Sequence, residues 1–234
     1  MRLTELPAWP GLEGMFWLLL TLALYRALSW IRARLNETGW AQPLLWGAII
    51  IAVLLVGLDI ELARYQLGGD WLIYILALST VSIGVPIYDN RHVIRAAAFP
   101  FLAAMCLGSA LAAGSAVMMA GLLDFDAALR ATLATKSITS PMAFGVASEI
   151  GGLPVLAMGI VIVTGNFGVL VAPKIFDVFG ITDPRAQGLA LGVVTHGIGT
   201  AEAVRRSALI GSFAGLAMGV NGVVTSLILP FAFL

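Results

Sequence analysis

Long apolar segments, each close to the length of a bilayer-spanning helix, follow one another through this chain of 234 residues. A transmembrane helix needs about 20 consecutive apolar residues. Six such segments cover residues 14–31, 43–58, 71–88, 93–123, 153–171 and 208–229. Only 11% of the residues are charged, which is too few to coat a water-facing globule. The sequence therefore predicts an all-α integral membrane protein whose apolar surface faces the lipid bilayer.

Two further apolar segments, 127–150 and 185–204, are interrupted by polar residues. With them the chain is expected to have about 6–8 transmembrane segments. We expect a single membrane domain over 1–234, made of scaffold helices (1–123), a first broken-helix repeat (124–183) and a second one (184–234). Pro100 is expected to kink the long segment 93–123. Cys106 lies in the same segment and is expected to be a small buried apolar side chain.

Charge sets the expected orientation and excludes some partners. Thirteen basic and thirteen acidic residues balance, so no nucleic-acid partner is expected. The N-terminus lacks the pattern of a cleaved signal peptide, so the first helix is expected to direct insertion. Basic pairs, which mark cytoplasmic loops, follow two helices at Arg32/Arg34 and Arg91/Arg95. The acidic loops are those with Asp59, Glu61 and Asp70 and with Asp124 and Asp126. We expect a multi-pass protein of a bacterial inner (plasma) membrane.

An internal repeat with an offset of 60 residues relates the two interrupted segments. Sliding the chain by 60 positions aligns identical residues without a gap, among them Thr135 with Thr195, Ile138 with Ile198, and the triplet Ala-Met-Gly at 157–159 with that at 217–219. Lys136 falls opposite His196. Each unit reads as a short apolar helix, a polar or glycine-rich break, a new helix start and a full span. Paired broken segments of this kind are typical of transporters.

The charge pattern favours an inverted arrangement of the two units. If each broken segment returns to the side from which it entered, the basic clusters after the first helix all fall on the cytoplasmic side and the units are inverted. If the segments cross the membrane instead, Lys174 and Arg185 fall outside and the units are parallel. We expect the re-entrant, inverted arrangement.

The two breaks are the expected substrate site, because a helix that begins inside a membrane offers free N–H groups to an anion. Uncoiled backbone at this depth also implies a cavity. Ser140, followed by Pro141, is expected to cap the first new helix, and Thr200 the second. Lys136 is the expected counter-charge, and His196 and Glu149 are the candidates for proton coupling. The full set of expected substrate-binding residues is Lys136, Ser137, Thr139, Ser140, His196, Gly197, Gly199, Thr200, Asn166 and Asn221.

Each of these residues also has a structural interpretation. Lys136 could extend to the membrane interface, and His196 could be a hydrogen-bonded residue within the bundle. Glu149 could face a turn, whereas Asn166 and Asn221 could join helices by hydrogen bonds. Thr80 and Ser82 could face the same cavity or bond to their own helix. No catalytic motif, metal-ligand cluster or cofactor motif is present, so an enzyme is not expected.

The chain resembles the LrgB/CidB family in several ordered motifs. They are TKSITSP at 135–141, SEIGGLP at 148–154, HGIGTA at 196–201 and GLAMGVNG at 215–222, with VPIY at 85–88 upstream. The resemblance covers the chain from about residue 45 to its end. Two departures stand out: Thr135 replaces a proline usual in the family, and Ala77-Leu78-Ser79 replaces a usual Gly-Pro-Ala.

The resemblance implies two competing functions. Some members of the family are described as holin- or antiholin-like proteins that modulate murein hydrolase export and cell lysis. Others, including a plant plastidic translocator with a similar region, carry small carboxylates such as glycolate, glycerate or pyruvate. A small LrgA/CidA-type membrane partner is also implied, and a homo-oligomer is a further possibility. The paired broken helices and the Lys136/His196 pair favour transport of a small carboxylate by alternating access over a simple lytic pore.

Overall fold

The computed structural model describes residues 9–35, 41–82 and 84–233. Every regular element within these ranges is an α-helix. The chain divides into two compact units, residues 1–82 and 83–234, and each is described by itself. The expected all-α fold is confirmed for the described residues.

The first unit contains α1 (Gly11–Arg34), α2 (Pro43–Gly57) and α3 (Leu62–Ser82). Its core forms where Trp17 of α1 packs with Ile51 and Leu55 of α2, and the ring of Tyr65 from α3 meets that of Trp17 edge to face. Helix α3 begins nine residues before the apolar segment 71–88 from which it was predicted. The side chains of Thr80 and Ser82 lie outside what the structure describes.

The second unit contains eight of the described helices. They are α4 (Gly84–Asp89), α5 (Arg91–Ala96), α6 (Ala98–Leu122), α7 (Ala127–Ala134), α8 (Ser140–Glu149), α9 (Pro154–Val178), α10 (Pro184–Arg206) and α11 (Ala208–Ala232). The segment 93–123 is not a continuous helix: it breaks at Ala97, between α5 and α6, one turn before Pro100. A proline breaks a helix at this place because it cannot donate to the carbonyl of residue i−4 and its ring clashes with that carbonyl. Pro100 itself lies in the first turn of α6, where an N–H has no intrahelical acceptor.

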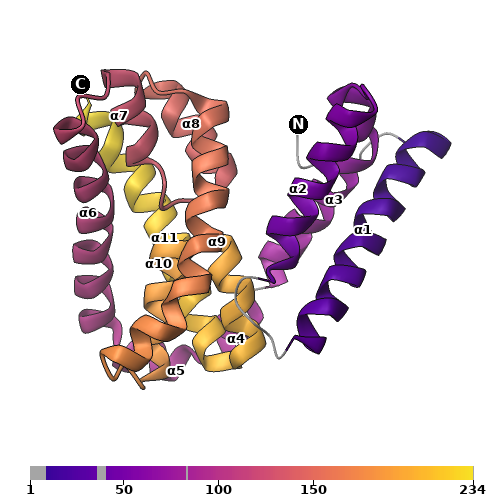
Figure 1. The fold of residues 1–234 in the computed structure, drawn as a ribbon. Coiled ribbons are helices and arrows are strands. Elements are labelled where there is room, and N and C mark those ends of the chain that lie inside the picture. The colour runs from indigo at the N-terminus through magenta and orange to yellow at the C-terminus, as the bar shows by residue number, and fades with distance from the viewer. Residues whose placement is uncertain (1–8, 36–40, 83, 234) are drawn as a thin grey trace. The chain divides into compact units, whose positions relative to one another are not determined.

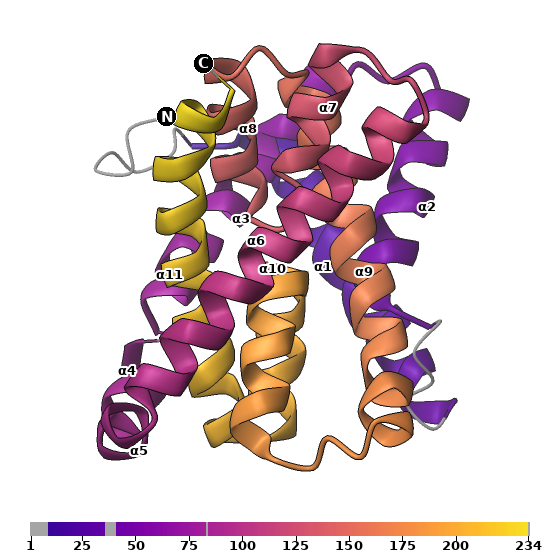
Figure 2. The same ribbon diagram turned by 90° about the vertical axis from the view of Figure 1, so that its left-hand side faces the viewer.

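Helices α9 and α11 lie on either side of α10 in the second unit (Figures 1 and 2). They run in opposite directions. Helices α7 and α8 lie toward the end where α9 begins, and α10 lies toward the other end, where α11 begins (Figure 2). Asp183 caps α10 by accepting a hydrogen bond from the backbone N–H of Arg185. The hydrogen-bonded Arg185 guanidinium also holds the pKa of this exposed carboxyl below its ordinary range, so the cap stays charged.

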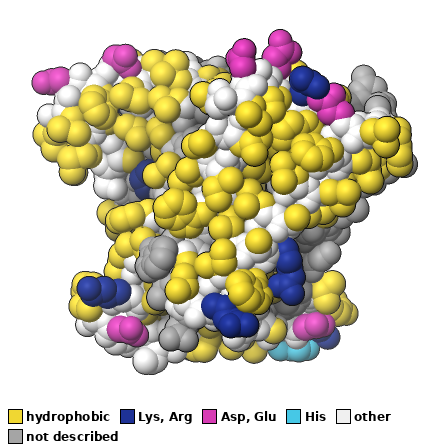
Figure 3. All heavy atoms as spheres, turned by 45° about the vertical axis from the view of Figure 1, so that its right-hand side comes forward, with side chains coloured by type: hydrophobic (Ala, Val, Ile, Leu, Met, Phe, Trp, Pro, Cys, Tyr) yellow, Lys and Arg dark blue, Asp and Glu magenta, His cyan; other side chains and the backbone are white. Residues whose placement is uncertain are grey.

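Four of the described helices, α1, α6, α9 and α11, are long and apolar enough to cross a membrane. Hydrophobic side chains cover most of the visible surface (Figure 3), as expected for a protein surrounded by lipid. Cys106 is exposed on α6, so the expectation that it is buried is wrong. An apolar residue of a lipid-facing helix needs no protein neighbour, because the lipid itself shields it from water.

Candidate functional site

The first break separates α7 from α8 and covers residues 135–139. Two tight turns form it: Lys136 N–H donates to the Leu133 carbonyl at 3.2 Å, and Ile138 N–H donates to the Thr135 carbonyl at 3.3 Å. The N-cap of α8 is Thr139 and not Ser140, which is the first helical residue. The Thr139 side chain makes no capping hydrogen bond. The first-turn N–H groups of α8 therefore have neither an intrahelical acceptor nor a side-chain cap.

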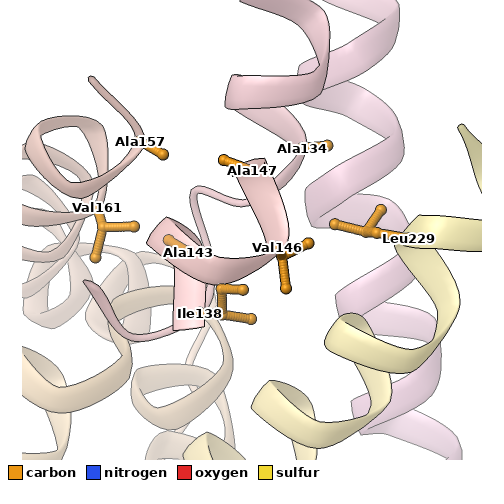
Figure 4. Close-up of a cluster of buried hydrophobic side chains, with 8 residues drawn as sticks. All are labelled: Ala134, Ile138, Ala143, Val146, Ala147, Ala157, Val161 and Leu229. Atoms are coloured by element: carbon orange, nitrogen blue, oxygen red, sulfur yellow. The ribbon is translucent and has the colours of Figure 1, made fainter. Parts of the chain in front are cut away.

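The chain reverses direction at the first break. Thr132, in the last turn of α7, accepts a hydrogen bond from the N–H of Leu153, which follows α8, at 2.8 Å. Thr132 also lies against Gly152. Helices α7 and α8 therefore form a hairpin whose tip is the break. Buried side chains from this hairpin, from α9 and from α11 pack into one apolar cluster (Figure 4).

The second break is a single residue, His196, with φ 41° and ψ −127° inside α10. Gly188, before the break, and Val204, after it, both lie against the first turns of α11, so this segment is also a hairpin. The prediction that Thr200 caps the second helix is wrong. Thr200 lies one turn beyond the break, and its hydroxyl donates to the His196 carbonyl at 2.8 Å.

Helix α9 holds the tip of the second hairpin. The His196 imidazole is buried, and its Nε2 lies 3.0 Å from the Val161 carbonyl oxygen. Because a carbonyl only accepts, Nε2 carries the hydrogen, and Nδ1 is the lone-pair nitrogen of the neutral ring. Gly165 gives the ring its space: a Cβ there would lie 2.8 Å from Cε1 and 3.0 Å from Nε2 of His196.

Helix α11 holds the tip of the first hairpin through Asn221. Its Nδ2 donates to the carbonyl of Ser137 at 2.8 Å and to that of Val193 at 3.4 Å. Its Oδ1 accepts from the hydroxyls of Ser109, on α6, and Thr225. This one side chain therefore contacts the first break, the first half of α10 and α6.

Lys136 and His196, which the repeat aligned, lie in the two breaks, and Asn221 joins the backbone beside each of them through the carbonyls of Ser137 and Val193. The partly buried Lys136 ammonium donates to the Ser137 hydroxyl at 3.2 Å. Of the other expected site residues, Thr139 and Ser140 lie at the start of α8, while Gly197 and Gly199 lie just beyond His196, with Gly199 packed against Thr195.

Glu149 and Asn166 stand apart from this arrangement in different ways. Glu149 is exposed at the far end of α8, a full helix away from the break. Asn166 is buried on α9 and donates to the Ile162 carbonyl of its own helix at 2.8 Å. Its Oδ1 is one of the buried side-chain atoms for which the described part of the chain supplies no partner. Asn166 thus retains an open acceptor, whereas Glu149 is not brought to the breaks.

Sequence reasoning missed three residues that hold the breaks: Ser109, Val161 and Gly165. Val161 acts through its backbone, and its side chain carries no signal for that role. Ser109 belongs to a helix outside the repeat. Of the three, only Gly165 could have been identified from the sequence, because a small residue beside an asparagine inside an apolar span is typical of a close approach by another segment.

Fold and site together define a helical membrane protein in which two helical hairpins bring their broken tips close together, with Lys136 on one tip and His196 on the other. The LrgB-like family matches residues 21–234. The chain belongs to this family.

Individual relatives agree with that assignment. The uncharacterized protein YwbG of Bacillus subtilis is 28% identical over 218 residues, covering 93% of this chain and 96% of that protein. The holin-like protein CidB of Staphylococcus epidermidis is 25% identical over 219 residues, covering 94% and 95%. CidB of Staphylococcus aureus is 25% identical over 218 residues, covering 93% and 95%. No solved structure matches the chain.

Proposed function

We propose that this protein carries a small carboxylate, of the size of glycolate, glycerate or pyruvate, across a bacterial inner membrane by alternating access. One observation carries the proposal: the Lys136 ammonium, partly buried between two helix breaks, has the Ser137 hydroxyl as its hydrogen-bond partner and no carboxylate within salt-bridge distance among the described residues. A cation at this depth needs an anion to offset its desolvation. The substrate would supply that anion.

The depth of the breaks supports this assignment. Helices α9 and α11 each have 25 residues, or about 37 Å at the α-helical rise, enough to cross a hydrocarbon core of about 30 Å. Of the residues that hold the breaks, Gly165 and Asn221 lie near the middle of these helices, and Val161 lies one turn before Gly165. Helix α8 has 10 residues, so it spans about 15 Å, or half of that core. A substrate at the tips would be near the membrane midplane, where carriers bind.

The hairpins and their holding helices also support an inverted repeat. The tip of the second hairpin (His196) bonds position 161, on α9 of the first repeat. The tip of the first hairpin (Ser137) bonds position 221, on α11 of the second repeat. Positions 161 and 221 differ by the repeat offset of 60. Two repeats related by a pseudo-two-fold axis make reciprocal contacts of this kind, and the opposite directions of α9 and α11 (Figure 2) favour an axis in the membrane plane. In transporters with inverted repeats, each repeat can adopt the conformation of the other, and this exchange is the basis of alternating access.

Each residue at the breaks has a separate role in the proposed mechanism. Lys136 and the free N–H groups at the start of α8 bind the carboxylate, and Asn166 Oδ1 remains able to accept a hydrogen bond from a substrate hydroxyl. His196 takes the coupled proton on Nδ1, because its Nε2 hydrogen is held by Val161. Glu149 lies too far from the breaks to serve in the same step.

Uptake of labelled glycolate and pyruvate into proteoliposomes, with and without an inward proton gradient, tests the proposal. We expect saturable, gradient-sensitive uptake that Lys136→Ala abolishes and Lys136→Arg partly retains. The chain's other lysine, Lys174, is exposed, so Lys174→Ala is the matched control and should transport normally. Equal uptake by Lys136→Ala and Lys174→Ala would refute the assignment of Lys136.

A holin-like function is the second candidate, favoured by similarity over nearly the full length to proteins named holin-like protein CidB. A pore would release unrelated dyes from the same vesicles without saturation and without dependence on Lys136. Flux that starts only when a small LrgA/CidA-type membrane protein is added would show that the chain works with a partner, and the oligomeric state of the purified protein would then be compared with that of the complex.

A further inference from the structure

We infer that Asn221 is a positioning residue that fixes the first break to α10 and α6, and that it does not itself bind the substrate. The inference rests on the proposed function only for what the breaks bind. It concerns how the tip of the first hairpin, and with it Lys136, is held in place.

The hydrogen-bonding capacity of Asn221 is already used. An amide side chain has two N–H donors and two acceptor sites. Both donors point to carbonyl oxygens, those of Ser137 and Val193, and both acceptor sites receive hydroxyls, those of Ser109 and Thr225. The side chain is also buried, with 1% of its surface exposed. A substrate could bind Asn221 only by displacing one of these partners.

The partners fix which way round the amide lies. Rotating it by 180° would place Oδ1 against the carbonyls of Ser137 and Val193, which cannot donate. The hydroxyls of Ser109 and Thr225 can donate or accept, so they suit either orientation of the amide. The Ser109 hydrogen, for example, also lies within reach of the Met105 carbonyl. The two carbonyls therefore determine the orientation and are the contacts that matter most.

The two carbonyls belong to the first break and to the part of α10 just before the second break, whose relative positions set the geometry of the site. Ser137 follows Lys136 directly, so holding its peptide sets where the ammonium and the start of α8 lie. Val193 lies one turn before His196. Asn221 thus joins the backbone on one side of the Lys/His pair to the backbone on the other, and Ser109 ties both to α6, which lies outside the repeat.

Cysteine reactivity at the break tests this inference without any transport. In a Cys106→Ser background, which removes the only cysteine, Thr139→Cys reports on the first break and Glu149→Cys on the far end of α8. Asn221→Asp keeps the size and the acceptors of Asn221 and removes both amide donors. We expect maleimide labelling of Thr139→Cys to rise about fivefold or more, the factor that loss of one buried hydrogen bond produces in an opening equilibrium, with Glu149→Cys unchanged.

Matched variants on α6 sharpen the test. Ser109→Ala removes one bond to Asn221 and should raise labelling of Thr139→Cys by a smaller factor. Ser115→Ala, whose exposed hydroxyl bonds its own helix, should leave it unchanged. Equal increases at both cysteines would mean general loosening and would overturn the inference. Unchanged labelling of Thr139→Cys would also overturn the inference, and if glycolate then protected this cysteine when Asn221 is present but not in the Asn221→Asp variant, Asn221 would be a substrate ligand. Uptake by Lys136→Ala tests the proposed transport function, and cysteine labelling tests the positioning role of Asn221, so either proposal can fail without the other.

Discussion

His196 occupies a backbone conformation that side-chain-bearing residues rarely adopt, with φ at 41°. Such a conformation costs about 1–3 kcal/mol and persists only where the surroundings enforce it. Three contacts do so here: the ring bonds the Val161 carbonyl, its edge lies against Gly165, and Thr200 bonds the His196 carbonyl. The strained residue and the expected proton acceptor are therefore the same residue.

Gly165→Ala should displace the imidazole, because a Cβ at this position would lie 2.8 Å from Cε1 of His196 and 2.9 Å from Cδ1 of Ile198. We expect it to lower the free energy of unfolding by about 1–3 kcal/mol and to reduce proton-driven uptake. Gly159→Ala, on the same helix with nothing within 4 Å, is the control and should be neutral or slightly stabilising. Thermal unfolding in detergent and uptake measure both. A neutral Gly165→Ala would mean that the ring is not held there.

Thr200→Val should weaken transport through the backbone and not through a lost ligand. Thr200 is fully buried, and its hydroxyl satisfies the His196 carbonyl. Valine has the same shape but removes this hydrogen bond, at a cost of about 0.5–1.5 kcal/mol. Thr200→Ser keeps the hydroxyl and should behave nearly as wild type. Uptake by each variant, divided by the amount of folded protein, gives the comparison. Equal loss in both would show that the methyl group, and not the hydroxyl, is what matters.

At the scale of elements, the second hairpin packs closely against α11. Helices α10 and α11 approach so closely at Gly192 that an added Cβ would meet the Ala214 carbonyl oxygen, and it would lie 2.7 Å from the Cβ of Ala217. Dispersion contact between backbones at small residues is the main source of helix association in lipid. The second hairpin is therefore firmly held by its own long helix.

Gly192→Ala should separate α10 from α11 and lower the melting temperature of the detergent-solubilised protein. The clash is with backbone, which cannot rotate away, so we expect a loss of about 1–3 kcal/mol. Gly219→Ala, on α11 with nothing within 4 Å of the added Cβ, should not lower it. If the two variants melted at the same temperature, the close approach of α10 to α11 would not contribute to stability.

Much of this architecture could be predicted from apolar run lengths, because lipid demands them. The breaks also carried a signal, since Lys136 and Ser137 interrupt one run and His196 and Gly197 the other. What failed were features decided by tertiary contacts. The N-cap of α8 is Thr139 and not Ser140, Thr200 lies inside a helix, and the segment 93–123 breaks at Ala97, one turn before Pro100. The role of Asn221 depends on Ser109 and Val193, which only the folded chain brings near.

At the scale of the molecule, the second unit has one basic end. Arg91, Arg95, Lys174, Arg185, Arg205 and Arg206 all belong to segments at the end where α10 and α11 begin. The opposite end, where α7 and α8 lie, carries Asp124, Asp126 and Glu149 with one basic residue, Arg130. By the positive-inside rule we expect the first end to face the cytoplasm. In that orientation the α7–α8 hairpin enters the membrane from the outside and returns to the outside.

Labelling from outside the cell distinguishes that arrangement from two crossing segments. In the Cys106→Ser background, Glu149→Cys marks the end of α8 and Thr182→Cys marks the exposed loop between α9 and α10. With a re-entrant hairpin, an impermeant maleimide reaches Glu149→Cys in intact cells, and it reaches Thr182→Cys only after permeabilisation. If residues 127–150 crossed the membrane, the two cysteines would exchange behaviour. Because the same chain gives opposite patterns in the two cases, labelling decides whether both broken tips can meet at the membrane midplane, which alternating access between them requires.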